Sequence, residues 1–207
     1  MKIIDITHPM SDRLAPWPGD TPFEFSLVAR LRDGASCNVG RLTCSIHTGT
    51  HLDAPFHYTA SGATVDALAP EIFIGPARVF LAPGREVITR EIFAGLDGRA
   101  TPRVLVRTNA CDVKSVFPSR IPTLAPDVPA WLGGQGVRLF GLDLPSVDPV
   151  DSKTLPLHHA LGATNIIILE NLDLRAVAAG VYELIALPLR LVGADGSPVR
   201  AVLIERT

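Results

Sequence analysis

The stretch 47-HTGTHLDAPFHY-58 places three histidines and one aspartate within eleven residues: His47, His51, Asp53 and His57. Imidazole nitrogens and carboxylate oxygens bind divalent cations, and histidine also transfers protons near neutral pH. A single histidine is more often an ordinary core or surface residue. Three of the chain's six histidines so close to an aspartate favour a metal site.

The spacing of these residues requires a bend in the backbone. In 41-RLTCSIH-47 apolar and polar residues alternate, which predicts a strand with its apolar face in the core and His47 at the end of its polar face. His51, Asp53 and His57 also have odd numbers, so in an extended chain they would point to the same side as His47. A helix would turn Asp53 away from that side. In a straight strand His47 and His51 would be roughly 13 Å apart, whereas ligands lie about 2.0–2.2 Å from a shared ion. We therefore predict a bend at Gly49, which has no Cβ to restrict its backbone.

A second group of candidate ligands lies later in the chain. His158 and His159 are adjacent, and Glu170 follows twelve residues after His158, at the end of the apolar run 166-IIILE-170. A carboxylate buried there without a partner would be costly, and either a metal ion or an arginine salt bridge would offset that cost. Nitrogen and oxygen ligands without thiolate suit Zn²⁺ or Mn²⁺. The residues alone leave these alternatives open.

Short strand patterns outnumber helical patterns along the chain. Strands are expected at 2–6, 23–29, 41–47, 77–82, 103–108, 137–143, 165–170, 182–191 and 199–205. Helices are expected at 90–96 with Thr89 as its cap, between Pro126 and the Gly133-Gly134 pair, and at 172–180. No linker, repeat or shift in composition divides the 207 residues. We therefore predict one domain, 1–207, of the α/β class with more strand than helix.

Composition argues against several classes of partner. The 19 basic and 21 acidic residues give a net charge of −2 without a basic run, so neither nucleic acid nor membrane is an expected partner. No apolar stretch reaches the roughly 20 residues of a membrane-spanning helix, and Asp5 interrupts any signal-peptide core, so we expect a soluble, cytoplasmic protein. Cys37, Cys44 and Cys111 form no C-x-x-C pair and are interpreted as small core residues.

The motif H-T-G-T-H-x-D-A-P-x-H resembles the signature of the cyclase-like metal-dependent hydrolases. The flanking sequence resembles more specifically the bacterial-type kynurenine formamidases. The segments that carry this resemblance are above all 14-LAPWPGDTPF-23, 141-GLDLPSVDPVDSKTLPLHH-159, 168-ILENLDL-174 and 182-YELIALPLRL-191. The resemblance runs essentially from end to end. It implies a compact fold with a strand-rich, partly barrel-like centre, a homodimeric assembly and a small-molecule substrate.

The resemblance also implies two divalent metal ions per chain, with zinc favoured and manganese as the alternative. His47, His51 and Asp53 would hold the first ion. Asp53 would bridge to a second ion held by His158 and Glu170. The preference for His158 over its neighbour rests on the step of twelve residues to Glu170.

Two further residues acquire roles from the same resemblance. His57 would be the catalytic acid and base, and Trp17, in the sequence W-P-G-D, would contact the substrate. The alternative for Trp17 is a loop tryptophan stacked on Pro16 and Pro18. The residues themselves leave both interpretations of Trp17 open.

The implied reaction is hydrolysis of N-formyl-L-kynurenine to L-kynurenine and formate in tryptophan breakdown. A metal ion would supply hydroxide by lowering the pKa of its bound water towards 7. The chain has no G-x-S-x-G sequence, which argues against a serine nucleophile. A related enzyme class opens the cyclic amide of isatin with a similar histidine motif and is one alternative. The other is a metal-binding homologue without activity, against which the presence of His57 argues.

Overall fold

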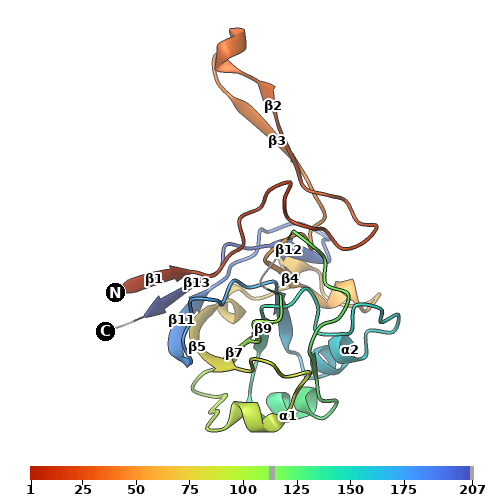
Figure 1. The fold of residues 1–207 in the computed structure, drawn as a ribbon, viewed down its shortest axis with the longest axis vertical. Helices are drawn as coiled ribbons and strands as arrows, with labels where there is room; N and C mark the ends of the chain where they lie inside the picture. Colours follow the sequence, from red (N-terminus) through yellow and green to blue (C-terminus); the bar gives the residue numbers. More distant parts are fainter. Residues whose placement is uncertain (112–114, 206–207) are drawn as a thin grey trace.

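The computed structural model describes residues 1–111 and 115–205. Its centre is one nine-stranded sheet with the strand order β1-β13-β11-β5-β7-β9-β10-β4-β12. These strands are β1 (Lys2–Asp5), β4 (His51–Asp53), β5 (Ile74–Leu81), β7 (Arg103–Arg107), β9 (Leu139–Leu142), β10 (Ile167–Glu170), β11 (Gly180–Ile185), β12 (Gly196–Pro198) and β13 (Val202–Glu205). The sheet curls into a half-barrel, and the two ends of the chain lie side by side on β1 and β13 (Figure 1).

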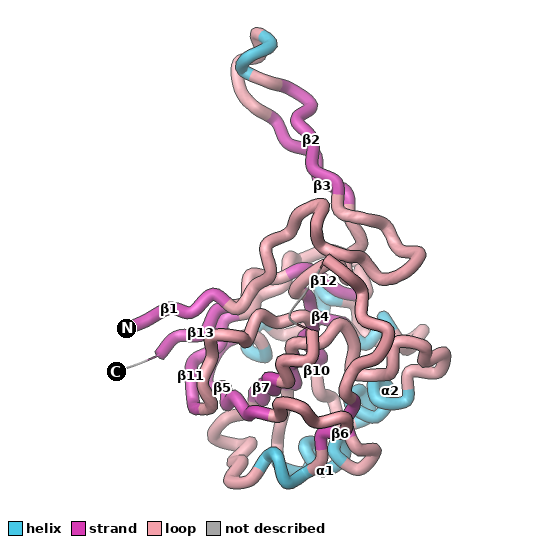
Figure 2. The backbone as a smooth tube through the Cα atoms, viewed as in Figure 1, coloured by secondary structure: helices cyan, strands magenta, loops and turns pink. Residues whose placement is uncertain are grey.

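The remaining elements are short. Two separate ladders consist of β2 (Glu24–Ala29) with β3 (Val39–Thr43), and β6 (Val87–Ile88) with β8 (Thr123–Leu124). The α-helices are α1 (Val128–Gln135) and α2 (Pro156–Ala163), and 3₁₀ turns span Leu31–Asp33, Pro55–His57, Val65–Ala67, Pro70–Ile72 and Arg90–Phe93. Figure 2 shows how much of the chain is loop. The expected α/β class with more strand than helix is confirmed, and so is the partly barrel-like centre. Within the described residues, no helix is long and apolar enough to cross a membrane.

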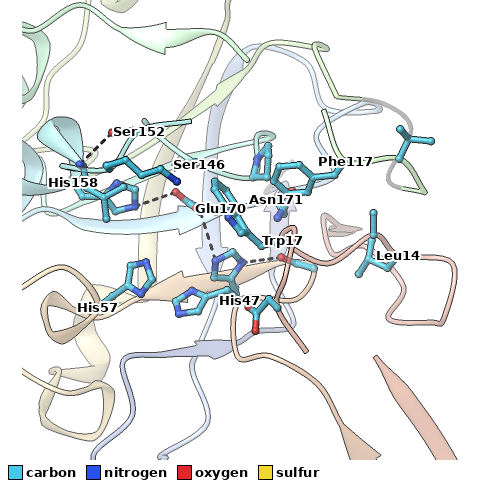
Figure 3. A pocket seen from close by; sticks show the side chains of 18 residues that line it. Leu14, Trp17, His47, His57, Phe117, Ser146, Ser152, His158, Glu170 and Asn171 are labelled. Atoms are coloured by element: carbon cyan, nitrogen blue, oxygen red, sulfur yellow. Dashed lines mark hydrogen bonds and ion pairs between the residues drawn. The ribbon is translucent and has the colours of Figure 1, made fainter. Parts of the chain in front are cut away.

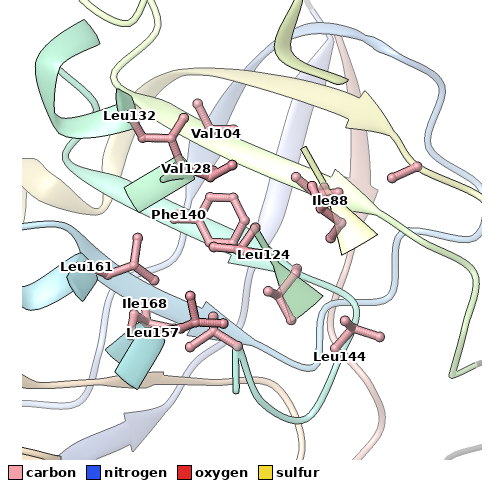
Figure 4. Packing of buried hydrophobic residues seen from close by; sticks show 14 of the residues in the cluster. Ile88, Val104, Leu124, Val128, Leu132, Phe140, Leu144, Leu157, Leu161 and Ile168 are labelled. Atoms are coloured by element: carbon pink, nitrogen blue, oxygen red, sulfur yellow. The ribbon is translucent and has the colours of Figure 1, made fainter. Parts of the chain in front are cut away.

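Strands β5, β7, β9 and β10 are parallel neighbours at the centre of the sheet. Parallel strands are covered on both faces and therefore read as continuous apolar runs. Alternate residues of these strands feed two separate cores. The first core lies between the sheet and the helices α1 and α2, and includes Val104, Phe140, Leu132, Leu161 and Ile168 (Figure 4). The second core fills the concave side of the curled sheet and includes Leu52, Leu105, Leu139, Leu169 and Leu203.

The hairpin formed by β2 and β3 stands clear of the body of the protein (Figure 1). Five of its large apolar side chains are exposed: Phe25, Val28, Leu31, Val39 and Leu42. The expected strand at 41–47 is confirmed only as far as Thr43, where β3 ends. The expectation that Leu42 lies in the core was wrong, because its side chain is exposed. The apolar alternation marks a hairpin that projects from the body rather than a strand of the central sheet.

The helix expectations were partly wrong as well. The expected helix at 90–96 is a 3₁₀ turn, Arg90–Phe93, without a side-chain cap from Thr89, while α1 continues through the glycine pair to the left-handed Gly136. Segment 172–180 forms no helix, because its backbone bonds to other parts of the chain: the Asp173 N–H donates to the Ile6 carbonyl at 2.9 Å. Of the three cysteines only Cys111 is buried, so the interpretation of all three as core residues was also wrong.

The predicted bend at Gly49 is confirmed. Gly49 has φ +72°, and a tight turn there separates β3 from β4. A Cβ at this position would lie 2.9 Å from Cδ2 of Leu14. The turn lets His47 fold back beside β4, which a straight strand would not allow.

The bend can be tested by comparing Gly49→Ala with Gly84→Ala. Both glycines have positive φ, but a Cβ on Gly84 meets nothing within 4 Å. The left-handed conformation alone costs an L-residue roughly 1–2 kcal/mol. We expect Gly84→Ala to lower the free energy of unfolding in urea by that amount. Gly49→Ala should lower it by more, because its Cβ would also crowd Leu14. Equal losses would mean that Leu14 moves away freely and that the turn is not tightly packed.

Candidate metal-binding active site

Strand pairing brings the first acidic and imidazole groups together. Antiparallel pairing of β4 with β10 sets Glu170 opposite His51, and Ile168 opposite Asp53. Since alternate residues of a strand share a face, His51, Asp53 and Glu170 lie on the face that carries the first core. Leu52 points the other way, into the second core. All three polar side chains are buried.

Helix α2 adds His158 to this group. Its Nε2 lies 3.5 Å from Oδ2 of Asp53 and 3.6 Å from Oε1 of Glu170. Its Nδ1 is 2.7 Å from Oδ2 of Asp148, a buried carboxylate that also accepts the backbone N–H groups of Leu157 and His158. His159 is exposed and its ring lies against Tyr58. The structure thus turns His158, rather than His159, towards Asp53.

His47 and His57 approach from the segments on either side of β4. Nδ1 of His47 lies 3.0 Å from Oδ1 of Asp53, and the rings of His47 and His57 are 4.1 Å apart between centroids. His57 ends the 3₁₀ turn Pro55–His57. Asp195, the residue before β12, places Oδ2 2.9 Å from Nε2 of His47 and 3.3 Å from Nδ1 of His57.

The central atoms form a box of two carboxylates and two imidazoles. Nε2 of His51 is 3.4 Å from Oδ1 of Asp53 and 3.5 Å from Oε2 of Glu170, matching the 3.5 and 3.6 Å distances from Nε2 of His158. Ligands about 2.1 Å from an ion at tetrahedral angles are separated by roughly 3.4 Å. These separations therefore suit ligands around cations better than direct hydrogen bonds.

An unpaired atom supports the same fit. Oδ2 of Asp53 is buried and has no hydrogen-bond partner, although buried carboxylate oxygens are normally satisfied. The outward nitrogen of each neighbouring imidazole is already engaged: Nδ1 of His51 donates to the Gly49 carbonyl at 2.8 Å. Such outer partners orient metal-binding histidines. Ligand atoms of His47, His51 and Asp53 lie within 4.8 Å of one another, as do those of Asp53, His57 and His158.

The charges of the site depend strongly on one another. Burial disfavours ionised Asp53, but the neighbouring imidazoles of His158, His47 and His51 outweigh it and hold the pKa of Asp53 well below its usual value. Burial and the nearby Asp53 charge raise the pKa of Glu170 well above normal. Burial also opposes protonation of His47 and His158, yet their carboxylate partners raise both pKa values to about 10. Metal binding must therefore displace protons from these two imidazoles at neutral pH.

His57 differs from the other two in its electrostatics. Burial lowers the pKa of His57 below 6.5, so its imidazole is neutral at pH 7 and can accept a proton. The downward direction of this pKa shift matters for catalysis, because a general base must be unprotonated before it can accept a proton. His57 is also less buried than His51 and His158.

A cavity of about 380 Å³ opens beside the histidines. Its wall includes His47, His57, His158 and Glu170, with Leu14, Trp17 and Phe117 further along it (Figure 3). Trp17 begins a turn in which the Asp20 N–H donates to the Trp17 carbonyl and Gly19 has φ +88°. That geometry, with Pro18 second in the turn, is typical of a type II turn. The turn presents Trp17 to Phe117 edge to face, with 4.8 Å between ring centroids.

Of the candidate residues from the sequence, all but Asp53 line this cavity, and Asp53 lies against the histidines that do. The structure adds three further residues. Asp148 and Asp195 bond to the histidines, and Phe117 pairs with Trp17. The alternative arginine partner for Glu170 is wrong, because in the described chain its ion pairs are with His51 and His158. Sequence reasoning missed the two aspartates because neither lies in a histidine-rich stretch. Their only signal was an aspartate in a turn-rich segment, in P-S-V-D-P and G-A-D-G-S-P.

Comparison with known proteins gives consistent results. The model of the family described as "Putative cyclase" matches residues 4–149. Kynurenine formamidases of Bacillus cereus and Bacillus anthracis are each 46% identical, over 97% and 98% of this chain and 96% and 97% of theirs.

Solved structures agree on the fold. One described as a potential metal-dependent hydrolase with cyclase activity superposes with a TM-score of 0.83 at 28% identity, covering 100% of this chain and 98% of the other. Isatin hydrolase A from Ralstonia solanacearum gives 0.79 at 24% identity, covering 99% and 92%, and shares the fold. Since the family model spans most of the chain and the formamidases match nearly all of it, this chain belongs to the cyclase family of metal-dependent hydrolases.

Proposed function

We propose that this protein is a kynurenine formamidase, which hydrolyses N-formyl-L-kynurenine to L-kynurenine and formate. The observation that carries the proposal is the 46% identity to kynurenine formamidases over 97% of the chain. The buried box of carboxylates and imidazoles beside an aromatic-walled cavity supports it. Opening of isatin is the second candidate, and the shared fold of the isatin hydrolases favours it less, at 24% identity.

Two divalent ions per chain, zinc before manganese, fit the donor set. His47, His51 and Asp53 would hold one ion through the nitrogens and Oδ1 that face one another. Asp53 Oδ2, His158 and Glu170 would hold the second. Such ions provide an acidic bound water and polarise a carbonyl group.

His57 would then move the protons. As a neutral imidazole it removes a proton from the attacking water while the oxygen–carbon bond to the formyl carbon forms. It returns that proton to the aryl nitrogen as the carbon–nitrogen bond breaks, which leaves a neutral aryl amine and formic acid. The formic acid then releases its proton to solvent and becomes formate. The turn Pro55–His57 keeps the ring within reach of the histidine cluster, 5.9 Å from the ring of His158 between centroids.

The cavity wall suggests how the substrate is oriented. Trp17 offers an aromatic surface for the aniline ring, and such stacking is worth about 0.5–1.5 kcal/mol beyond burial. Away from the histidines, the described residues that line the cavity include one anion and one cation, Asp20 and Lys153. An α-amino acid end carries an ammonium and a carboxylate group. We therefore assign Asp20 to the ammonium and Lys153 to the carboxylate.

We also propose that the protein forms a homodimer. The projecting hairpin of β2 and β3 exposes a group of large apolar side chains, which is unusual for an isolated monomer.

The metal assignment predicts the ion content of variants. Element analysis of purified wild type should find about two divalent ions per chain. Asp53→Ala should lose both ions, because each would bind one of the two oxygens that this change removes, and Glu170→Gln should weaken or lose one. Glu24→Gln, which neutralises an exposed carboxylate on β2, should keep both. A wild type that is fully active after exhaustive chelation would refute the metal site.

The role of His57 predicts separate effects on turnover and metal. His57→Gln should keep its ions but lose roughly two to four orders of magnitude in kcat, the usual contribution of a general acid and base. His159→Gln changes the exposed histidine next to His158 and should leave kcat within twofold of wild type. If His57→Gln loses an ion instead, His57 is a ligand, as its proximity to Asp53 and His158 would permit.

The substrate itself is tested by comparing kcat/KM for formylkynurenine, simple formanilide and isatin. We expect kcat/KM to be highest for formylkynurenine, lower for formanilide and lowest for isatin. Lys153→Gln and Asp20→Asn should raise KM for formylkynurenine and leave formanilide hydrolysis unchanged, because formanilide has no charged groups for them to hold. Trp17→Ala should weaken the binding of both. A preference for isatin would overturn the substrate assignment and leave the metal site standing.

A further inference from the structure

Asp195 occupies a special place beside the histidine cluster. One oxygen, Oδ2, lies 2.9 Å from Nε2 of His47 and 3.3 Å from Nδ1 of His57. The two imidazoles belong to different segments and have different proposed roles, ligand and proton carrier. A single carboxylate oxygen therefore contacts both kinds of histidine at once.

The backbone holds Asp195 firmly in this position. Its carbonyl accepts the N–H of Ala54 at 2.8 Å, and the next residues pair with β4 through Gly196 opposite Asp53. A Cβ on Gly196 would lie 2.6 Å from the Leu52 carbonyl and 3.1 Å from Cε1 of His47. Only glycine allows β12 to pass so close beneath His47. Asp195 is thus fixed to the same strand that carries His51 and Asp53.

The chemistry of a carboxylate then dictates where the protons are. The Asp195 side chain is 38% exposed to solvent, where a carboxylate is ionised at neutral pH, and an ionised carboxylate can only accept hydrogen bonds. Both nitrogens that face Asp195 must therefore carry hydrogen. Nδ1 of His47 is then free to face Asp53, and Nε2 of His57 is free to accept a proton.

We infer that Asp195 is a positioning residue that sets the tautomers of His47 and His57 together. This rests on the proposed roles of the two histidines. Asp148 fixes His158 in the same manner but touches a single histidine. Asp195 differs because it contacts both His47, the proposed metal ligand, and His57, the proposed proton carrier. One carboxylate therefore fixes which nitrogen each of these two imidazoles presents to the site.

The experiment compares Asp195→Ala and Asp195→Asn with Asp66→Ala. Asp66 accepts the Gly193 N–H at 3.0 Å and the Thr64 hydroxyl at 2.8 Å, and so anchors the same loop through partners other than histidine. Three quantities are measured: zinc affinity by chelator competition, kcat and KM with formylkynurenine, and the histidine tautomers from ¹⁵N–¹H spectra of zinc-loaded and metal-free protein.

We expect Asp195→Ala to weaken zinc binding and to lower kcat by roughly 10- to 100-fold each, the usual effect of removing such an outer partner. KM should stay within twofold, and His57 should populate the other tautomer. Asp195→Asn should lie between Ala and wild type. Asp66→Ala should match wild type in all three measurements.

Other outcomes overturn the inference. Unchanged tautomers in Asp195→Ala would show that the carboxylate does not set them, even if activity falls. Loss of a whole zinc ion would make Asp195 a ligand. If wild type fails to hydrolyse formylkynurenine, the proposed function fails, but the tautomer and zinc measurements still decide the role of Asp195.

Discussion

Two buried carboxylates on neighbouring strands are the constraint on which the site depends. Asp53 and Glu170 share one face of the β4–β10 ladder, where their mutual repulsion and burial would be prohibitive without compensation. Imidazoles offset part of this cost, and the box they form has the dimensions of a cation shell. The outer partners Asp148 and Asp195 follow from the same requirement, because each imidazole must present one particular nitrogen inward.

Much of the site could be predicted because its chemistry is local in sequence. A few consecutive residues predict that His51 and Asp53 share one face of a strand and that the chain bends at Gly49. Both predictions agree with the structure. Asp195 could not be predicted in this way. It lies 148 positions from its partner His47, and only the pairing of β12 with β4 brings them together.

The fold shows the same division between local and distant information. Continuous apolar runs such as 104–106, in β7, predicted the central strands correctly, because strands buried on both faces leave a clear pattern. The apolar residues of the β2–β3 hairpin alternate with polar ones as they would in a half-buried strand, yet they are exposed. The alternation alone does not show whether a strand lies in the central sheet or in a projecting hairpin. Segment 172–180 has a helical composition, but backbone hydrogen bonds to distant segments prevail over that propensity.

The adjacency of β1 and β13 has a consequence for biosynthesis. The ribosome releases β1 long before β13, so β1 must wait for this partner in the sheet. β4 likewise gains its second neighbour, β12, only when residues 196–198 have emerged. Contacts of such wide sequence separation slow folding. A nascent chain that already exposes His47 and Asp53 therefore lacks the Asp195 carboxylate beside His47 until residues 195–198 have been made.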